Sequence, residues 1–370
     1  MKVGILTITP NIGFGGILQA YALSYVLKQM GHSVHVINYT SGYSLKSRMV
    51  FFVKSLIKAV KGQFVKYSHH AEIQYCSQNV ATFIRNNLNF TIKVTSANQL
   101  ANLINTSFDV VVVGSDQVWR PKYVLGIENY FLANVNLGVK KISYAASFGV
   151  DNFEYSEKEA RTCSNLLKSF SYVSVREESG LKLLKNNLHY DGQAFCDLDP
   201  TLLAGEIAFK NFIRGAAPST GQIFSYILDV SPGKQSLLNE VGNTLGKTVL
   251  NFSTNAENPS KPLNERVAPP VEDWLSGLYH SDFIVTDSFH GCVFSILFNK
   301  PFLVYVNRKR GAERFISVLS QLNLSDRMIG SFEEFDPGIL NRTIEWEGVN
   351  NTLLTQRNII MSRLSIALNK

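Results

Sequence analysis

The chain has 370 residues, more than one ordinary hydrophobic core organises, so we expect two domains. Hydrophobic residues make up 45% of the sequence and charged residues 18%, as in a folded protein with a water-exposed surface. The net charge of +7 favours anionic partners, such as phosphorylated metabolites or an anionic membrane surface, whereas the absence of zinc-finger spacing, RNA-binding aromatic motifs and basic-region helices argues against nucleic acid.

The cysteines and the apolar runs indicate where the protein works. Cys76, Cys163, Cys196 and Cys292 have no metal-ligand spacing and suit buried thiols in a reducing compartment. Cys292 is a candidate nucleophile, but a buried thiol is the favoured interpretation. The first apolar run is short and predicts a strand rather than a signal peptide, and no run approaches the ~20 apolar residues of a membrane span. We therefore expect a cytoplasmic protein without a metal site.

The first elements form a βαβ unit. Residues 3–8 predict a buried strand, residues 17–30 a helix and residues 33–38 a second strand, parallel to the first. The glycine-rich turn at residues 9–16 has room for a phosphate or a sugar, although it lacks the G-x-G-x-x-G pattern of dinucleotide-binding proteins. A tight turn that merely needs glycine is the alternative.

A basic segment follows at residues 41–70. It contains six lysines and arginines and no acidic residue, and its apolar residues recur at helical spacing. A basic amphipathic helix at residues 44–67 would lie on an anionic membrane surface. The alternative is a basic, solvated helix that packs on its own domain.

Polar residues follow two later strands of the first half. The strand at residues 108–113 ends near Asp116, a candidate base or sugar-hydroxyl acceptor, and Trp119, a candidate stacking platform for a sugar ring. An Asx-type turn is the alternative for Asp116. The strand at residues 172–175 ends in Arg176, which would grip a carboxylate or phosphate or else pair with the adjacent Glu177 or Glu178.

The second half repeats the alternation of strands and helices. A strand at residues 301–306 ends in three further polar residues, Asn307, Arg308 and Arg310. The pattern predicts two Rossmann-like domains facing a cleft, with the first domain at residues 1–203, the second at 204–350 and a final helix at 351–370 that packs back on the first domain.

The stretch at residues 284–298 carries the sharpest site signal. An apolar strand ends, Asp287 and Ser288 can both cap a helix, and apolar residues then recur at helical spacing. His290 should therefore lie in the first turn of a helix at the carboxyl end of a strand, where free amides attract anions. Gly291 would let a ligand approach the backbone.

Six short motifs in this order resemble the polysaccharide pyruvyl transferase family. They are Asn-Ile-Gly with Leu-Gln-Ala-Tyr-Ala-Leu at residues 11–13 and 18–23, Gly-Ser-Asp-Gln-Val-Trp at 114–119, Tyr-Ala-Ala-Ser-Phe-Gly at 144–149, Val-Ser-Val-Arg-Glu-Glu-Ser-Gly at 173–180, Asp-Pro-Thr-Leu-Leu at 199–203, and Thr-Asp-Ser-Phe-His-Gly with Asn-Lys-Pro at 286–291 and 299–301.

The resemblance implies a GT-B-like fold and transfer of the pyruvyl group of phosphoenolpyruvate to a sugar. The product is a ketal, phosphate is released, and no metal or organic cofactor is used. His290 and Arg176 match the residues that the family uses at the donor. Some relatives have an arginine where this chain has Ser288, so Arg308 or Arg310 would replace that contact.

These inferences define a predicted site. His290 is the expected acid, and Asp116 the base or acceptor anchor, with Asp287 as the alternative base. The expected donor contacts are Arg176, Ser288, Phe289, His290, Gly291, Asn307, Arg308 and Arg310. The expected acceptor contacts are Asn11, Gly13, Gln19, Asp116 and Trp119. The expected acceptor is a lipid-linked oligosaccharide, so the enzyme would work peripherally at the inner face of the membrane.

Two other classes of function fit the same elements. A glycosyltransferase that uses a nucleotide sugar would want an acidic residue for the ribose late in the second domain, and Glu313 is the candidate. A non-catalytic protein that binds glycans or membranes would rest mainly on the basic segment.

Overall fold

A computed structural model describes residues 1–9, 13–40, 70–215, 222–253, 261–306 and 311–369. The basic segment at 44–67 and the predicted site residues Asn11, Asn307, Arg308 and Arg310 lie outside these ranges. No helix within the described ranges is long and apolar enough to cross a membrane.

The first domain is built on a six-stranded parallel sheet. Its strands, in spatial order, are β2 (Ser33–Val36), β1 (Lys2–Leu6), β3 (Val110–Val113), β4 (Lys140–Ala146), β5 (Tyr172–Val175) and β6 (Ala194–Cys196). Its helices are α1 (Phe14–Gln29), α3 (His70–Cys76), α4 (Gln78–Asn87), α5 (Ala97–Ser107), α6 (Glu157–Leu167), α7 (Glu178–Asn186) and α8 (Pro200–Ala204). The first βαβ unit is parallel, as predicted.

The second domain repeats the design with five parallel strands. In spatial order these are β11 (Met328–Ile329), β10 (Phe302–Tyr305), β9 (Phe283–Thr286), β7 (Ile223–Tyr226) and β8 (Val249–Asn251). The helices are α9 (Pro232–Leu245), α10 (Val271–His280), α11 (Phe289–Leu297), α12 (Glu313–Gln321) and α13 (Trp346–Asn369). Short 3-10 turns connect several of these elements. The predicted α/β architecture with two parallel sheets is confirmed.

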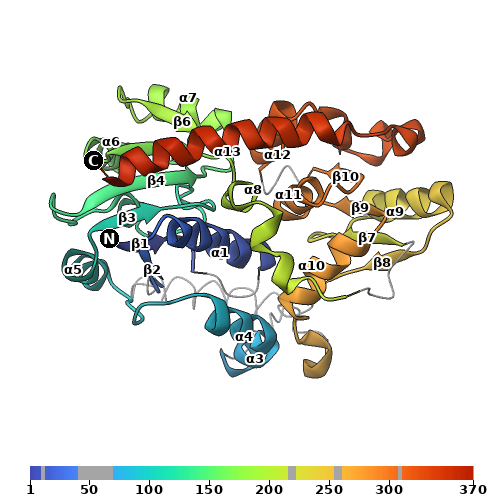
Figure 1. Ribbon diagram of the computed structural model, residues 1–370, viewed down its shortest axis with the longest axis horizontal. Helices are drawn as coiled ribbons and strands as arrows, with labels where there is room; N and C mark the ends of the chain where they lie inside the picture. Colours follow the sequence, from blue (N-terminus) through green and yellow to red (C-terminus); the bar gives the residue numbers. More distant parts are fainter. Residues whose placement is uncertain (10–12, 41–69, 216–221, 254–260, 307–310, 370) are drawn as a thin grey trace, which may run out of the picture.

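Helix α13 ties the two domains together. It begins at Trp346, before the predicted boundary at residue 351, and extends from the second sheet to the first (Figure 1). Arg357 Nε donates to the carbonyl of Leu202 at 2.6 Å, and Arg363 pairs with Asp197 at 2.6 Å. The helix therefore packs on the first domain although it follows the second in sequence.

The start of α1 also bridges the domains. Phe14, its first residue, is fully buried and stacks on Trp274 of α10 with ring centroids 5.7 Å apart. The same ring lies 6.3 Å from that of Tyr226 at the end of β7. This contact fixes the amino end of α1 against the second domain, at the edge where the strands of both sheets end.

Candidate active site

A cavity of about 560 Å³ lies between the two domains, at the carboxyl ends of their parallel strands. The first domain lines it with Ile8, Gly13, Phe14, Gly15, Gly16, Asp116, Gln117 and Tyr123. The second domain lines it with Tyr226, Leu228, Asp287, Ser288, Phe289, His290, Arg314 and Phe315. The predicted residues Gly13, Asp116, Ser288, Phe289 and His290 are thus brought together in one place.

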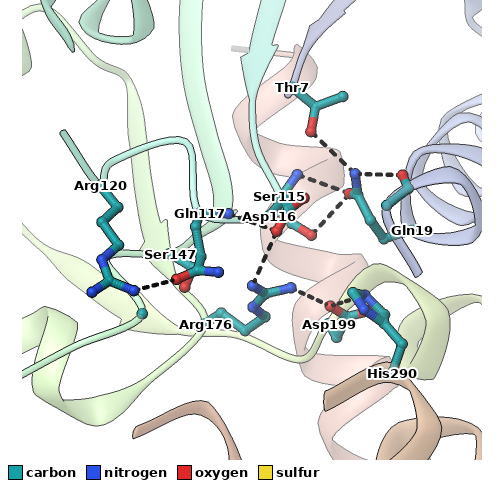
Figure 2. Close-up of polar contacts among 12 residues, drawn as sticks. Thr7, Gln19, Ser115, Asp116, Gln117, Arg120, Ser147, Arg176, Asp199 and His290 are labelled. Atoms are coloured by element: carbon teal, nitrogen blue, oxygen red, sulfur yellow. Dashed lines mark hydrogen bonds and ion pairs between the residues drawn. The ribbon is translucent and has the colours of Figure 1, made fainter. Parts of the chain in front are cut away.

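Asp116 follows β3 and faces the cavity with a side chain that is 21% exposed. Its Oδ1 atom accepts a hydrogen bond from the amide of Gln117 at 2.8 Å and lies 3.8 Å from Nη2 of Arg176 (Figure 2). The chain turns here, but the hydrogen bond goes to the next residue and not to the second one, as the Asx-type turn predicted as an alternative would require. The carboxylate reaches the cavity.

Gln19 supports this strand end from behind. Its Oε1 accepts from the amide and the hydroxyl of Ser115 at 3.2 and 3.1 Å, and its Nε2 donates to Oγ1 of Thr7 and to the carbonyl of Gly16. The side chain is fully buried. The predicted acceptor contact of Gln19 is corrected accordingly, because its amide joins β1, α1 and the loop after β3 instead of facing a ligand (Figure 2).

Arg176 lies in the wall behind the cavity. It is 4% exposed, and its Nη1 donates to Oδ2 of Asp199 at 2.8 Å. The expected alternative pairing with Glu177 is wrong, since Glu177 Oε1 accepts from the amides of Phe148 and Gly149 at 2.7 and 2.8 Å. The Nε and Nη2 atoms of Arg176 have no hydrogen-bond partner among the described residues.

His290 is the second residue of α11 and is only 8% exposed. Its Nε2 atom lies 3.7 Å from Oδ2 of Asp199, and Gly15 packs against its ring. Burial lowers the pKa of His290 to about 4, with Asp199 opposing and Arg176 reinforcing that shift. The imidazole of the free protein is therefore neutral at pH 7.

Ser288 caps the helix that carries this histidine. Its Oγ accepts from the amide of Gly291 at 3.4 Å, and its own amide donates to Oγ1 of Thr286. The predicted ligand approach at Gly291 is wrong, because an added Cβ would lie 2.4 Å from Oγ1 of Thr286. Glycine is required there by helix-to-strand packing.

Asp287 does not serve as a free base. Its carboxylate accepts from the amides of Leu228 and Asp229 at 2.6 and 3.1 Å and from Nζ of Lys234 at 2.6 Å. It is 2% exposed, so its role is to join the loop after β7 to the end of β9. Asp116 remains the carboxylate available to a ligand.

Trp119 is a further correction. It is fully buried, its Nε1 donates to the carbonyl of Tyr130 at 3.0 Å, and its ring stacks on Phe131 at 4.8 Å. A sugar cannot reach this ring, so Trp119 belongs to the core of the first domain. Cys292 is likewise buried, and burial raises the pKa of its thiol, which argues against a nucleophile.

Arg314 was not anticipated from the sequence. It is the second residue of α12, is 7% exposed and lines the cavity. Two guanidinium groups contact the ring of Phe289, with Cζ of Arg176 at 4.7 Å and Cζ of Arg314 at 5.2 Å from its centroid. The sequence pattern that could have indicated Arg314 is a basic residue in the first turn of a helix, where that helix follows the loop at the end of a strand.

Two Rossmann-like domains with a polar cavity between their strand ends define a protein of GT-B architecture. The polysaccharide pyruvyl transferase family model matches residues 14–309, and the chain belongs to this family. The family implies a pyruvyl transferase that acts on a sugar of a polysaccharide. No curated protein matches the chain significantly.

Solved structures are similar to the chain at low sequence identity. Arabidopsis thaliana UGT89C1 complexed with UDP-L-rhamnose aligns with a TM-score of 0.51 and 9% identity over 98% of this chain and 99% of the other. The UDP-GlcNAc 2-epimerase from Neisseria meningitidis bound to UDP-GlcNAc aligns with a TM-score of 0.49 and 13% identity over 98% and 99% of the two chains.

Proposed function

We propose that the protein transfers the pyruvyl group of phosphoenolpyruvate to two hydroxyls of a sugar, forming a ketal and releasing phosphate. The observation that carries this proposal is the meeting of His290, Asp116 and Arg314 in one interdomain cavity. Phosphoenolpyruvate is a small polyanion, and it needs cations and helix amino ends at a site large enough for a sugar as well.

The charges around His290 are balanced before the donor binds, so the charge of the donor can change the protonation of this residue. Arg176 and Arg314 are balanced by Asp116 and Asp199, and the histidine itself is neutral. An entering polyanion adds negative charge beside the ring and raises the pKa of His290, because nearby negative charge favours the imidazolium. Donor binding would thus load the acid that the reaction needs.

The reaction then balances when solvent supplies one proton to His290 and receives one from Asp116. The His290 imidazolium protonates carbon 3 of the donor, and carbon 2 becomes electrophilic. A sugar hydroxyl adds to carbon 2 and its proton passes to Asp116. The bond from carbon 2 to the phosphate oxygen breaks, a second hydroxyl closes the ketal, and its proton leaves with the phosphate group. Asp116 then releases its proton to solvent, and His290 takes a proton from solvent when the next donor binds, so the two hydroxyl protons balance those delivered to carbon 3 and to phosphate.

The proposed reaction uses no metal ion or organic cofactor, since protein cations and helix amides hold the donor. Full turnover after treatment with a chelator is the expected result, and a requirement for an added divalent cation would contradict this part of the proposal.

The proposed acceptor is a lipid-linked oligosaccharide at the cytoplasmic face of the membrane. Its support is the basic sequence at 44–67, which the structure does not describe. Replacing Lys54, Lys58 and Lys61 by glutamine should weaken binding to phosphatidylserine liposomes and leave turnover of a water-soluble acceptor intact. Liposome binding that does not change would contradict peripheral attachment.

The decisive experiment is incubation of the purified protein with phosphoenolpyruvate and lipid-linked galactose- or mannose-type acceptors. Phosphate release and a product with the mass of the pyruvyl ketal are the expected results. His290→Ala and Asp116→Asn should each lose most of the phosphate release while remaining folded. Arg176→Ala should lose it as well, together with stability, because the buried carboxylate of Asp199 loses its counter-charge. Phosphate release by His290→Ala at the wild-type rate would remove His290 from the mechanism.

A further inference from the structure

Arg314 occupies a special position among the residues around the cavity. Among the described residues that line it, Arg314 is the one lysine or arginine. Arg176 lies behind the wall and is held by Asp199 at 2.8 Å. The hydroxyl of Ser288 caps α11. Among the described residues, Arg314 is therefore the one that brings a guanidinium to the lining of the cavity.

The guanidinium of Arg314 stays charged although it is buried. Burial lowers the pKa of Arg314 to about 10, and Arg176 contributes to that shift while Asp116 and Glu177 oppose it. The group is therefore a cation at pH 7, in a place where little water screens its charge. The guanidinium carbon of Arg314 lies 5.2 Å from the centroid of the Phe289 ring, a cation–π contact that helps to hold the side chain in place.

Two helix amino ends face the same cavity from opposite domains. Helix α1 contributes Phe14, Gly15 and Gly16 to the lining, and it has neither a side-chain cap nor an acidic residue in its first turn. Helix α11 contributes Phe289 and His290, also without an acidic residue in its first turn. These ends carry partial positive charge and free amide donors.

A buried polar atom points to a ligand independently of the helix ends. The Nε2 atom of His290 is buried and has no hydrogen-bond partner among the described residues, while Gly15 closes over the ring. A buried nitrogen without a partner is costly unless a ligand or water satisfies it. The cavity beside it contains the charge that an anion requires.

We propose that Arg314, together with the amino end of α1, binds the phosphate group of the donor. This inference rests on the proposed function for the identity of the donor. The phosphate would bridge the two domains, with α1 on one side and α12 on the other. The carboxylate of the donor would lie on the opposite side of the carbon that reacts.

The test compares Arg314→Gln and Arg314→Lys with Arg327→Lys, a variant of a buried arginine that donates to the carbonyls of Ile339 and Arg342, outside the cavity lining. Titration calorimetry measures binding of phosphoenolpyruvate, inorganic phosphate and pyruvate. Arg314→Gln should lower the affinity for phosphoenolpyruvate and for inorganic phosphate about 10- to 100-fold, as expected for loss of a charged hydrogen-bond partner. Arg314→Lys should retain part of that affinity, and Arg327→Lys should match the wild type.

The outcomes separate this inference from the proposed function. Unchanged phosphate affinity in folded Arg314→Gln or Arg314→Lys would overturn the inference and leave pyruvyl transfer standing. Weakened pyruvate binding with unchanged phosphate binding would overturn it too, because Arg314 would then hold the carboxylate. Arg314-dependent binding of inorganic phosphate by a protein that never turns over phosphoenolpyruvate would support the phosphate site and contradict the proposed function. Circular dichroism of each variant checks that the fold is intact.

Discussion

Nε2 of His290 lies 3.7 Å from Oδ2 of Asp199, and the two residues belong to different domains. Asp199 also caps α8 through the amide and hydroxyl of Thr201, at 3.0 and 2.7 Å, and receives the guanidinium of Arg176 at 2.8 Å. One buried carboxylate thus connects a helix cap, an ion pair and the proposed acid. Although burial alone would raise the pKa of Asp199, His290 and Arg176 lower it, so this carboxylate is ionised.

Replacing Asp199 by asparagine should destabilise the fold strongly. The substitution keeps the shape but leaves the buried guanidinium of Arg176 without its nearest counter-charge. Breaking one side of a buried ion pair costs about 3–5 kcal/mol, which urea unfolding monitored by circular dichroism would measure.

Asp273→Asn is the matched control for that substitution. Asp273 pairs with Arg214 at the same distance of 2.8 Å, but both side chains are largely exposed. An exposed pair contributes about 0–1 kcal/mol, so this variant should unfold almost as the wild type does. Equal losses in the two variants would show that Asp199 is not the buried anchor described here.

The depressed pKa of His290 should make stability depend on pH. The ring binds a proton in the unfolded chain below pH 6.5 but in the folded protein only near pH 4. Between pH 6.5 and 4 the unfolded chain binds the proton and the folded protein does not. The free energy of unfolding is therefore highest above pH 6.5 and falls by about 3 kcal/mol as the pH decreases toward 4. The groups that face the ring are Asp199, Asp116, Arg176 and Arg314.

Urea unfolding at pH 7 and pH 5 measures this effect. His290→Asn should remove most of the difference in unfolding free energy between the two pH values. His189→Asn, a change at an exposed histidine, should leave the difference in place. A pH dependence that survives in His290→Asn would assign it to other groups.

The sequence predicted correctly that polar strand-end residues of the two sheets lie close together in space. Strand-end polar residues such as Asp116, Ser288 and His290 converge because parallel strands place their carboxyl ends on one side, and periodicity is enough to find those strands. The partner of Arg176 could not be read in this way. Asp199 follows another strand, whereas the sequence suggested Glu177 or Glu178 as the partner because they are the nearest acidic residues in the chain.

The wrong site predictions concern residues whose side chains are buried. Trp119 and Gln19 lie in motifs that also contain ligand-facing residues, and a motif does not show which of its members point inward. Arg314 was missed for a related reason. Its contact with Phe289 depends on how α12 packs beside α11, and no local pattern encodes the packing of two helices joined through a long connection.

Trp119→Phe tests whether this residue acts through stability. Phenylalanine keeps the stacking on Phe131 but loses the hydrogen bond to the carbonyl of Tyr130, which remains buried without that donor. We expect a loss of about 1–3 kcal/mol in unfolding free energy and an unchanged KM for the sugar acceptor. A raised KM with unchanged stability would instead support the original prediction that Trp119 stacks on a sugar ring.

Gly15→Ala tests how closely the two domains must meet at the site. An added Cβ would lie 2.1 Å from Nδ1 of His290, so either the imidazole turns away or α1 moves from the second domain. Misplacing a reacting group by about 1 Å can cost about 100-fold in rate, and we expect kcat for phosphate release to fall by about that factor.

Gly348→Ala is the control for this change, because Gly348 lies in the first turn of α13, is exposed and has no atom within 4 Å of an added Cβ. It should retain wild-type turnover, with stability equal to or slightly above that of the wild type, since alanine favours a helix. Wild-type turnover in Gly15→Ala would mean that the working site is more open than this interdomain contact. In that case the amino end of α1 would not close on His290 during the reaction.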